Sequence, residues 1–217
     1  VNSWDAGTYE QRGLIGTNGQ KLEFVELNAS DLADNVLEKF DCGNEDITEY
    51  LKKYAKEDSI TGKGVTYILT DQEKKDIYAY ATIKTHSLYY LDNSDRHHMI
   101  SEKEKEPLLV AIPAVEIKMF AISRKLRGQI AYLLDPKGNN NYSNIFFRML
   151  LEKLYYMSMD TIGFQMIFLR ANTEGEALYR KNRFVDCEEY LDTYDEKAEG
   201  CKPLAITLSN LEDVIFT

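Results

Sequence analysis

The chain has 217 residues, with 26 basic and 36 acidic side chains, a formal net charge of −10, and 44% hydrophobic residues. This is the composition of a globular protein with a buried core, which excludes a disordered chain. The acidic balance counts against a general nucleic-acid binder, because like charges repel a polyanion. The length favours one domain with insertions, which we place at residues 21–217, after an N-terminal arm of residues 1–20.

The cysteines and the apolar runs indicate a cytoplasmic protein without a metal centre. Three cysteines, Cys42, Cys187 and Cys201, lack metal-ligand spacing and leave an odd thiol, which favours a reducing compartment. No run approaches the ~20 apolar residues of a membrane span, and the N-terminus has no apolar signal core. The pair His97–His98 has no third ligand at a defined spacing, and no histidine suits a cysteine hydrolase.

The first half of the chain predicts a strand, two helices and a hairpin. Alternation over 21–27 indicates the strand, and a helical pattern follows from Ser30 or Asp31. Asn44 is the expected N-cap of the second helix, and the glycines at 62 and 64 end it. Segments 65–69 and 77–83 then predict a hairpin. The expected buried positions of the two helices are Leu32, Val36, Leu37 and Phe40, then Ile47, Leu51 and Tyr54.

The second half predicts a strand–helix–strand–helix core. A polar insertion, 89–113, precedes a central strand at Ala114–Ser123, and a loop from 124 to 142 leads to a helix that we expect Ser143 to cap. The run 165–171 suits a buried strand, and Thr173 with Glu176 forms a capping box for the next helix. Segments 185–190 and 204–208 predict a closing hairpin, whose acidic connection we interpret as a solvated loop.

A basic window in this acidic chain marks a candidate anion site. Between Ile117 and Leu134 stand four basic residues and no acidic one: Lys118, Arg124, Lys125 and Arg127. The window follows a strand and precedes a helix N-terminus, where unpaired N–H groups and the helix dipole favour a phosphate.

Two segments, Ala114–Ser123 and Ala171–Phe184, resemble the acyl-CoA site of the GNAT N-acetyltransferases. The second has the family's ending of a strand, Asn172, and a helix with a tyrosine and a terminal aromatic residue. The resemblance extends over about 22–208 and implies an α/β (α+β layered) fold, with a central mixed, mostly antiparallel sheet flanked by helices. It also implies acetyl-CoA as the acyl donor and no metal.

The resemblance implies roles for particular residues. Tyr179 would protonate the leaving CoA thiolate, and Glu116 would accept a proton from the acceptor amine. Other roles remain open, because Tyr179 could pack as an ordinary helix residue and Glu116 could pair with Lys118 or a neighbouring strand. The implied acetyl-CoA contacts are Phe120, Ala121, Ile122, Arg124, Arg127, Gly128, Ser143, Asn144, Asn172 and Tyr179.

The pyrophosphate loop departs from the family pattern Q/R-x-x-G-x-G/A. The nearest match is 127–132, where larger residues occupy both glycine positions. Either the amides of 138–144 at the helix start bind the pyrophosphate instead, which we favour, or the site is degenerate.

The implied reaction is acetyl transfer from acetyl-CoA to an amine of an unidentified acceptor. One alternative is a catalytically silent domain that senses acyl-CoA or binds a partner, which would explain the lost glycines. A second is an aminoacyl-tRNA-acetylating toxin with an antitoxin, because Phe40–Asn44 and Tyr50–Ala55 resemble that GNAT subgroup. The net charge of −10 argues against a broad tRNA-binding surface, and a homodimer stays open.

Overall fold

The computed structural model describes residues 14–15, 21–92, 108–131, 135, 137–191 and 200–216. The chain divides into two compact units: Val1–Thr82 with Met119–Phe147, and Ile83–Lys118 with Arg148–Thr217. Strands β4 (Ile77–Asp92) and β5 (Leu108–Ile122) each contribute residues to both units. The strands are hydrogen-bonded in the order β1-β2-β3-β4-β5-β6-β8-β7.

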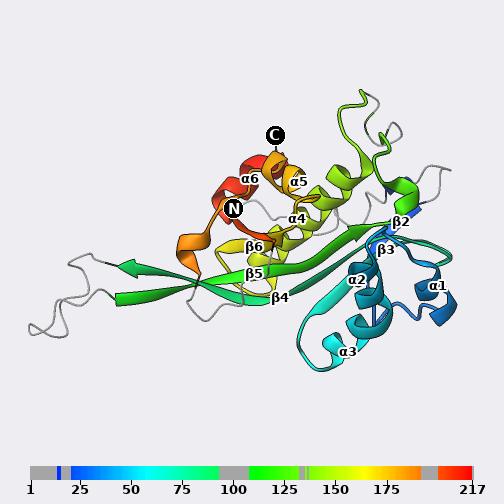
Figure 1. Cartoon of the computed structure of the whole chain (residues 1–217), viewed down its shortest axis with the longest axis horizontal. Coiled ribbons are helices and arrows are strands. Elements are labelled where there is room, and N and C mark those ends of the chain that lie inside the picture. The colour runs from blue at the N-terminus through cyan, green and yellow to red at the C-terminus, as the bar shows by residue number, and fades with distance from the viewer. Residues whose placement is uncertain are drawn as a thin grey trace, which may run out of the picture. The chain divides into compact units, whose positions relative to one another are not determined.

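The first unit packs short helices against β2 and β3 (Figure 1). Its outer strands are β1 (Leu14–Ile15), β2 (Lys21–Glu26) and β3 (Val65–Asp71), each antiparallel to the next. Its helices are α1 (Asp34–Lys39), α2 (Glu45–Glu49) and α3 (Ala55–Ile60), and a π-helical turn, Tyr50–Tyr54, joins the last two. The core they share includes Val36, Leu37, Phe40, Leu51, Ile68 and Tyr80.

The helix ends in this unit follow from local hydrogen bonding. Asn44 caps α2 as predicted, since its Oδ1 accepts from Ile47 N at 3.1 Å. The prediction for α1 is wrong at its start: Ser30 Oγ donates to Leu27 O at 2.6 Å and Asp31 has φ +48°, so a turn occupies these residues and the helix begins at Asp34.

The π-helical turn changes which side chains of the second helical segment are buried. Leu51 is buried as predicted, but Tyr54 is 53% exposed, and Ala55 is the buried residue instead. A π turn holds one residue more than an α turn, so the buried position moves from the third to the fourth residue after Leu51. The prediction that Tyr54 is buried is therefore wrong.

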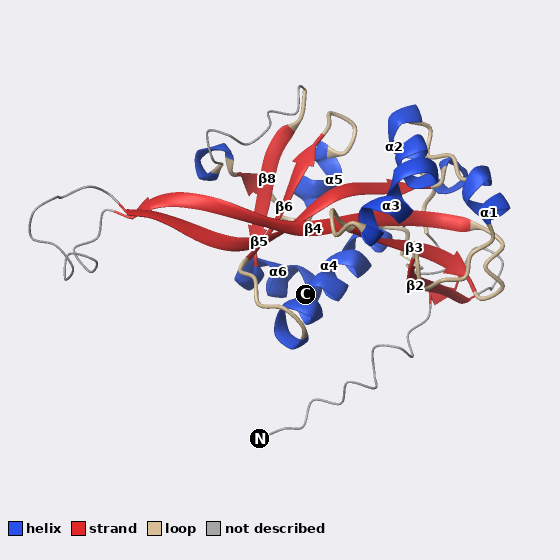
Figure 2. Ribbon diagram, turned by 90° about the horizontal axis from the view of Figure 1, so that it is seen from below, coloured by secondary structure: helices blue, strands red, loops and turns tan. Residues whose placement is uncertain are grey.

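The second unit surrounds a parallel strand pair. β6 (Met166–Ala171) runs parallel to β5, with Glu116 opposite Phe168, and β8 (Lys202–Thr207) runs antiparallel to β6. The short β7 (Val185–Asp186) pairs with β8. Helix α5 (Glu176–Lys181) follows β6, and α4 (Tyr142–Asp160) and α6 (Leu208–Phe216) lie on the same side of β5 (Figure 2). The buried residues here include Leu150, Leu154, Ile167, Leu169, Leu204, Ile206 and Leu211.

Several predicted boundaries in the second half need correction. The insertion is shorter than 89–113, because β4 continues to Asp92 and β5 begins at Leu108; residues 93–107, with His97–His98, lie outside the described residues. Asn141, and not Ser143, caps α4, since Asn141 Oδ1 accepts from Asn144 N at 2.9 Å. Helix α6 was not predicted, and 192–199 of the acidic connection lies outside the described residues.

The predicted fold class is confirmed: a mixed sheet with helices packed on it, in which the pairing of β5 with β6 is parallel. In the part of the chain that the structure describes, no helix has the length and apolar character needed to cross a membrane.

Candidate functional site

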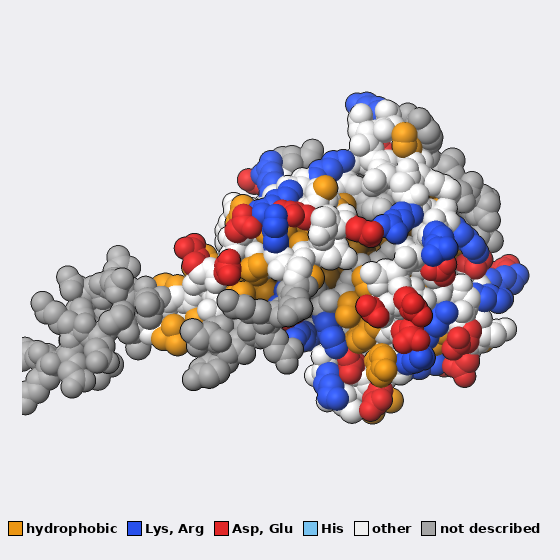
Figure 3. Space-filling view, in the orientation of Figure 1, with side chains coloured by type: hydrophobic (Ala, Val, Ile, Leu, Met, Phe, Trp, Pro, Cys, Tyr) orange, Lys and Arg blue, Asp and Glu red, His pale blue; other side chains and the backbone are white. Residues whose placement is uncertain are grey.

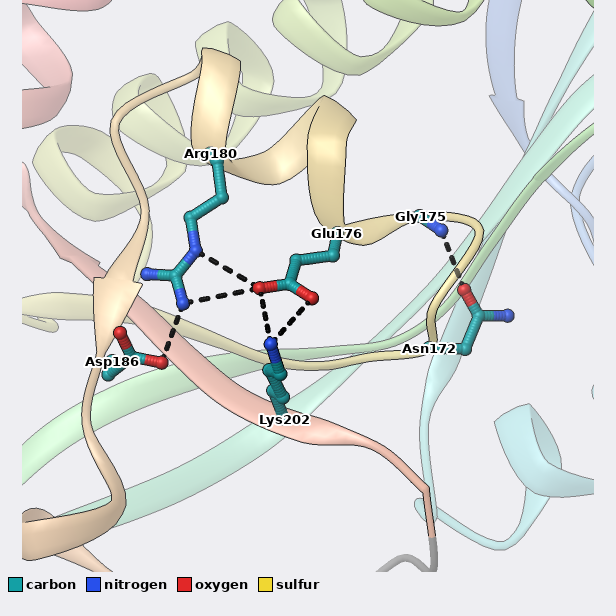
Figure 4. A network of polar contacts seen from close by, with 6 residues as sticks. All are labelled: Asn172, Gly175, Glu176, Arg180, Asp186 and Lys202. Carbon is teal, nitrogen blue, oxygen red and sulfur yellow. Dashed lines mark hydrogen bonds and ion pairs between the residues drawn. The ribbon is translucent and has the colours of Figure 1, made fainter.

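The turn between β6 and α5 is organised by Asn172. Its side-chain Oδ1 accepts from Gly175 N at 2.8 Å (Figure 4), and its backbone carbonyl accepts from Gly175 N and from Glu176 N, each at 3.1 Å. The predicted capping box is wrong in its residue, since Asn172, and not Thr173, satisfies the first amides before the helix. Asn172 thereby fixes where α5 begins relative to the end of β6.

Tyr179 lies one turn into α5 and is half-buried. A Cβ atom built on Gly175 would stand 2.9 Å from Tyr179 Cε2 and 3.1 Å from Asn172 Oδ1, so the ring and the amide converge on the glycine. The ring of Phe184 lies 6.3 Å away between centroids. The structure therefore brings the two predicted residues Asn172 and Tyr179 together, across a gap that only a glycine leaves open.

The environment of Tyr179 keeps its hydroxyl protonated. Burial, and secondarily the nearby Cys201 thiol, raises the pKa of Tyr179 to about 12. The neutral phenol therefore persists far above physiological pH, and its O–H is a hydrogen-bond donor throughout that range.

An ion network ties α5 to the neighbouring strands (Figure 4). Glu176 accepts from Lys202 on β8 at 2.9 Å and from Arg180 at 3.4 Å, and Arg180 also donates to Asp186 on β7 at 2.6 Å. Lys202 accordingly lowers the pKa of Glu176. Solvent screens these charges, so each pair contributes little by itself, but together they hold a helix too short to be stable alone.

Glu116 lies in a buried charge cluster of the second unit. It is 4% exposed, and its Oε1 accepts from Arg170 Nη1 at 2.6 Å, while Oε2 lies 3.1 Å from Lys84 Nζ and 3.6 Å from His86 Nδ1. The partners come from β4 and β6, on either side of β5. Glu116 is thus paired with neighbouring strands, which is one of the two roles that the sequence left open.

Phe168 forms the base of this cluster. The His86 ring stacks on it at 4.5 Å with an interplanar angle of 10°, and the Arg170 guanidinium lies 4.9 Å from the ring centre. Lys84, His86 and Arg170 were not predicted as site residues, although alternation along β4 and β6 places such residues on one face. The strand order, which the sequence does not give, makes them neighbours of Glu116.

In the first unit, the part of the basic window that holds Arg124, Lys125 and Arg127 follows the end of β5. Ser123 N donates to Tyr78 O at 2.8 Å, and a 3₁₀ turn, Arg124–Leu126, follows. Arg124 is largely exposed, and its Nε lies 3.3 Å from Asp41 Oδ2. Beside this turn is a cavity of about 330 Å³, lined by Val36, Lys39, Phe40, Asp41, Asp76, Ile77, Ser123, Arg124 and Lys125.

The other residues predicted to contact acetyl-CoA lie in the same unit. Ala121 and Ile122 are buried, and the half-buried Phe120 packs edge-on against Phe147 at 5.1 Å. Gly128 is exposed, with φ +72°, and Ser143 is half-buried in the first turn of α4.

Asn144 is less available for a ligand than the sequence suggests. It is 3% exposed, its backbone N–H donates to Asn141, and its side chain donates to Asn140 Oδ1 at 2.6 Å. The arginines of the window are therefore more accessible to an anion than this amide.

No family model and no curated protein matches the chain. Solved structures match it in fold. A bacterial toxin has 14% identity and a TM-score of 0.64, over 91% of this chain and 96% of that one. AtaTR bound with AcCoA has 19% identity and a TM-score of 0.62, over 90% and 98%. AtaT complexed with acetyl-methionyl-tRNAfMet has 19% identity and a TM-score of 0.61, over 91% and 100%. The chain therefore has the fold of GNAT toxins.

Proposed function

We propose that this protein is an N-acetyltransferase that transfers the acetyl group of acetyl-CoA to an amine. The observation that carries the proposal is the convergence of Tyr179 and Asn172 on Gly175, directly after β6. In this arrangement the neutral phenol of Tyr179 belongs to the short helix α5, which the ion network holds directly after the carboxyl end of β6. The bound AcCoA of the similar AtaTR structure supports the choice of donor.

Tyr179 is the proposed proton donor to the CoA thiolate. The amine attacks the thioester carbonyl, backbone N–H groups of the central strand polarise that carbonyl, and the C–S bond breaks as the negative charge moves to sulfur. The phenol of Tyr179 then donates its proton to the thiolate, and the proton that the acylated nitrogen loses passes through solvent to restore the phenol. The phenol is neutral at neutral pH, and its raised pKa of about 12 makes it a weak acid that gives up its proton only as negative charge develops on the sulfur.

Arg124 and Arg127 are the proposed contacts of the pyrophosphate. Both belong to a window without acidic residues and both side chains are exposed. A guanidinium group can form two parallel hydrogen bonds to phosphate oxygens. In our proposal these bonds replace the phosphate contacts of the glycine loop in the pattern Q/R-x-x-G-x-G/A.

Glu116 remains a second candidate for the chemistry, as the base for the amine. Its contacts favour the structural role, because Arg170 hydrogen-bonds to Oε1, Lys84 Nζ lies 3.1 Å from Oε2, and only 4% of the residue is exposed. Oε2 accepts no hydrogen bond from the residues that the structure describes, so it is the oxygen that a base acting through water would use. Replacement by glutamine separates the two roles.

The proposed acceptor is an amine, and no particular small molecule is assigned to it. A charged-tRNA acceptor is favoured by one observation, the similarity in fold to AtaT complexed with acetyl-methionyl-tRNAfMet. Figure 3 shows basic and acidic side chains intermingled on the described part of the face in view, which gives a polyanion little attraction. Acetylation of an aminoacyl-tRNA would therefore need recognition of its aminoacyl end more than of its backbone.

The test is release of CoA thiol from acetyl-CoA in the presence of three acceptor classes: small amines, peptides and aminoacyl-tRNAs. We expect turnover with at least one class, and loss of turnover with retained acetyl-CoA binding in Tyr179→Phe. Tight binding of acetyl-CoA without turnover on any class would instead identify a silent sensor domain. Absence of acetyl-CoA binding by calorimetry would refute the proposal.

A further inference from the structure

The turn between α1 and α2 lies against both arginines of the basic window. Gly43 has φ +86°, and a Cβ atom built there would stand 3.1 Å from Arg127 Nη1 and 3.3 Å from Arg124 Nε. The two guanidinium groups, three residues apart in sequence, thus lie beside one backbone position. All of these residues belong to the first unit.

Asp41 fixes the other side of the same turn. Its backbone carbonyl accepts from Arg124 N at 2.8 Å and its Oδ2 pairs with Arg124 Nε at 3.3 Å. Its second carboxylate oxygen, Oδ1, accepts from Gly43 N at 2.7 Å, which closes a side-chain-to-backbone turn. One aspartate therefore holds the glycine in its left-handed conformation and Arg124 in place.

The residues that follow make this turn rigid. Cys42 N donates to Thr48 Oγ1 at 3.3 Å, Cys42 Sγ donates to Asn44 O at 3.4 Å, and Asn44 caps α2. The buried thiol of Cys42 is thus a local structural contact. Each residue from 41 to 44 makes an interaction that keeps the backbone of Gly43 against the guanidinium groups.

We propose that the Asp41–Asn44 turn is a positioning element that holds Arg124 and Arg127 in the geometry in which they bind the acetyl-CoA pyrophosphate. The inference rests on the proposed function and assigns a role to the Phe40–Asn44 motif. A flexible arginine loses side-chain entropy when it binds a phosphate, and a preset guanidinium pair loses less. The turn therefore compensates for the glycines missing from the loop at 127–132.

The test is Gly43→Ala in the full chain, with Gly62→Ala as its matched control. Gly62 has φ +73°, and a Cβ atom built there would meet no other atom within 4 Å, so alanine causes the same kind of backbone strain without touching an arginine. We expect Gly43→Ala to weaken CoA binding, measured by calorimetry, by about tenfold or more. Gly62→Ala should bind CoA like the wild type.

Two further readouts distinguish positioning from a general loss of structure. The loss in Gly43→Ala should be greater at low than at high NaCl concentration, because salt screens an arginine–phosphate contact. In a protein that already carries Arg124→Ala and Arg127→Ala, adding Gly43→Ala should cause no further loss, since coupled residues are not additive. If Gly43→Ala does not fold, Gly43→Asn replaces it, because asparagine tolerates a positive φ.

The possible results have separate meanings. A wild-type protein that binds no CoA would overturn the proposed function, and the positioning role with it. A wild-type protein that binds CoA, together with a folded Gly43→Ala or Gly43→Asn of equal affinity, would overturn only the positioning role. An additive loss in the double-arginine background would likewise assign Gly43 to general stability.

Discussion

Replacing Gly175 with alanine should slow acetyl transfer by moving the ring of Tyr179. The new methyl carbon would lie 2.9 Å from Tyr179 Cε2, and carbon atoms pack at about 3.5–4.0 Å, so the ring must shift by roughly 0.6–1 Å. A displacement of ~1 Å in a reacting group can reduce the rate by about 10²-fold. We therefore expect a large fall in kcat and little change in the KM for acetyl-CoA.

The same substitution should also change the free energy of unfolding, through two opposing contributions. Gly175 has φ −87° and ψ −20°, a conformation that alanine adopts freely, so the smaller entropy of the unfolded chain contributes about 0.4–1 kcal/mol in favour of the variant. Overpacking against the ring costs about 1–3 kcal/mol. The free energy of unfolding should thus fall by no more than about 2.5 kcal/mol.

The assay is steady-state CoA thiol release, with thermal unfolding followed in parallel. Gly163→Ala is the matched control, because a Cβ atom at Gly163 would meet no neighbouring atom within 4 Å, and it should give wild-type turnover. If chemistry limits the rate and Gly175→Ala keeps the wild-type kcat, the position of the Tyr179 ring does not affect the transfer step. The proposed role of Tyr179 as proton donor would then be refuted.

Three further predictions concern the same residues. Activity that depends on the neutral phenol of Tyr179 is lost only as pH rises through its pKa of about 12, so the pH–rate profile should show no fall in rate from tyrosine ionisation below about pH 11. A fall in rate below that pH that disappears in Tyr179→Phe would contradict the assigned environment. Glu116→Gln should lower the free energy of unfolding by about 3–5 kcal/mol, measured by chemical denaturation, because it removes the buried charge that pairs with Arg170. Reduced kcat at unchanged stability would instead make Glu116 the base. Replacing Arg124 and Arg127 together with alanine should raise the KM for acetyl-CoA, more strongly at low salt, and a salt-independent KM would remove their assignment.

Local patterns were sufficient to predict the elements whose ends are set by nearby residues. Asn44 caps its helix as predicted, the glycine at 62 follows the end of α3, and the strands 65–69 and 77–83 both form. Where two nearby residues could cap, the sequence did not decide between them. Asn141 caps α4 in place of Ser143, and Asn172 instead of Thr173 accepts hydrogen bonds from the amides of the turn before α5.

Contacts between strands could not be predicted in this way. The sequence places Glu116 on β5, but its partners Lys84 and Arg170 become neighbours only through the strand order β4-β5-β6. The surroundings of Gly43 could not be predicted either. Its left-handed conformation is a local property, but its position beside Arg124 depends on the fold. Whether the residues assigned to acetyl-CoA bind it stays a prediction.

The π-helical turn at Tyr50–Tyr54 makes the first unit unusually tolerant of a change in chain length. Deleting one residue from an ordinary helix rotates every later side chain by about 100° around the axis, which moves buried residues into solvent. Here an extra residue is already accommodated, between the fully buried Leu51 and Ala55. Removal of the partly exposed Lys52 or the exposed Lys53 would restore three-residue spacing and leave both apolar side chains on the same face. We therefore expect a variant that lacks Lys52 or Lys53 to keep the same core.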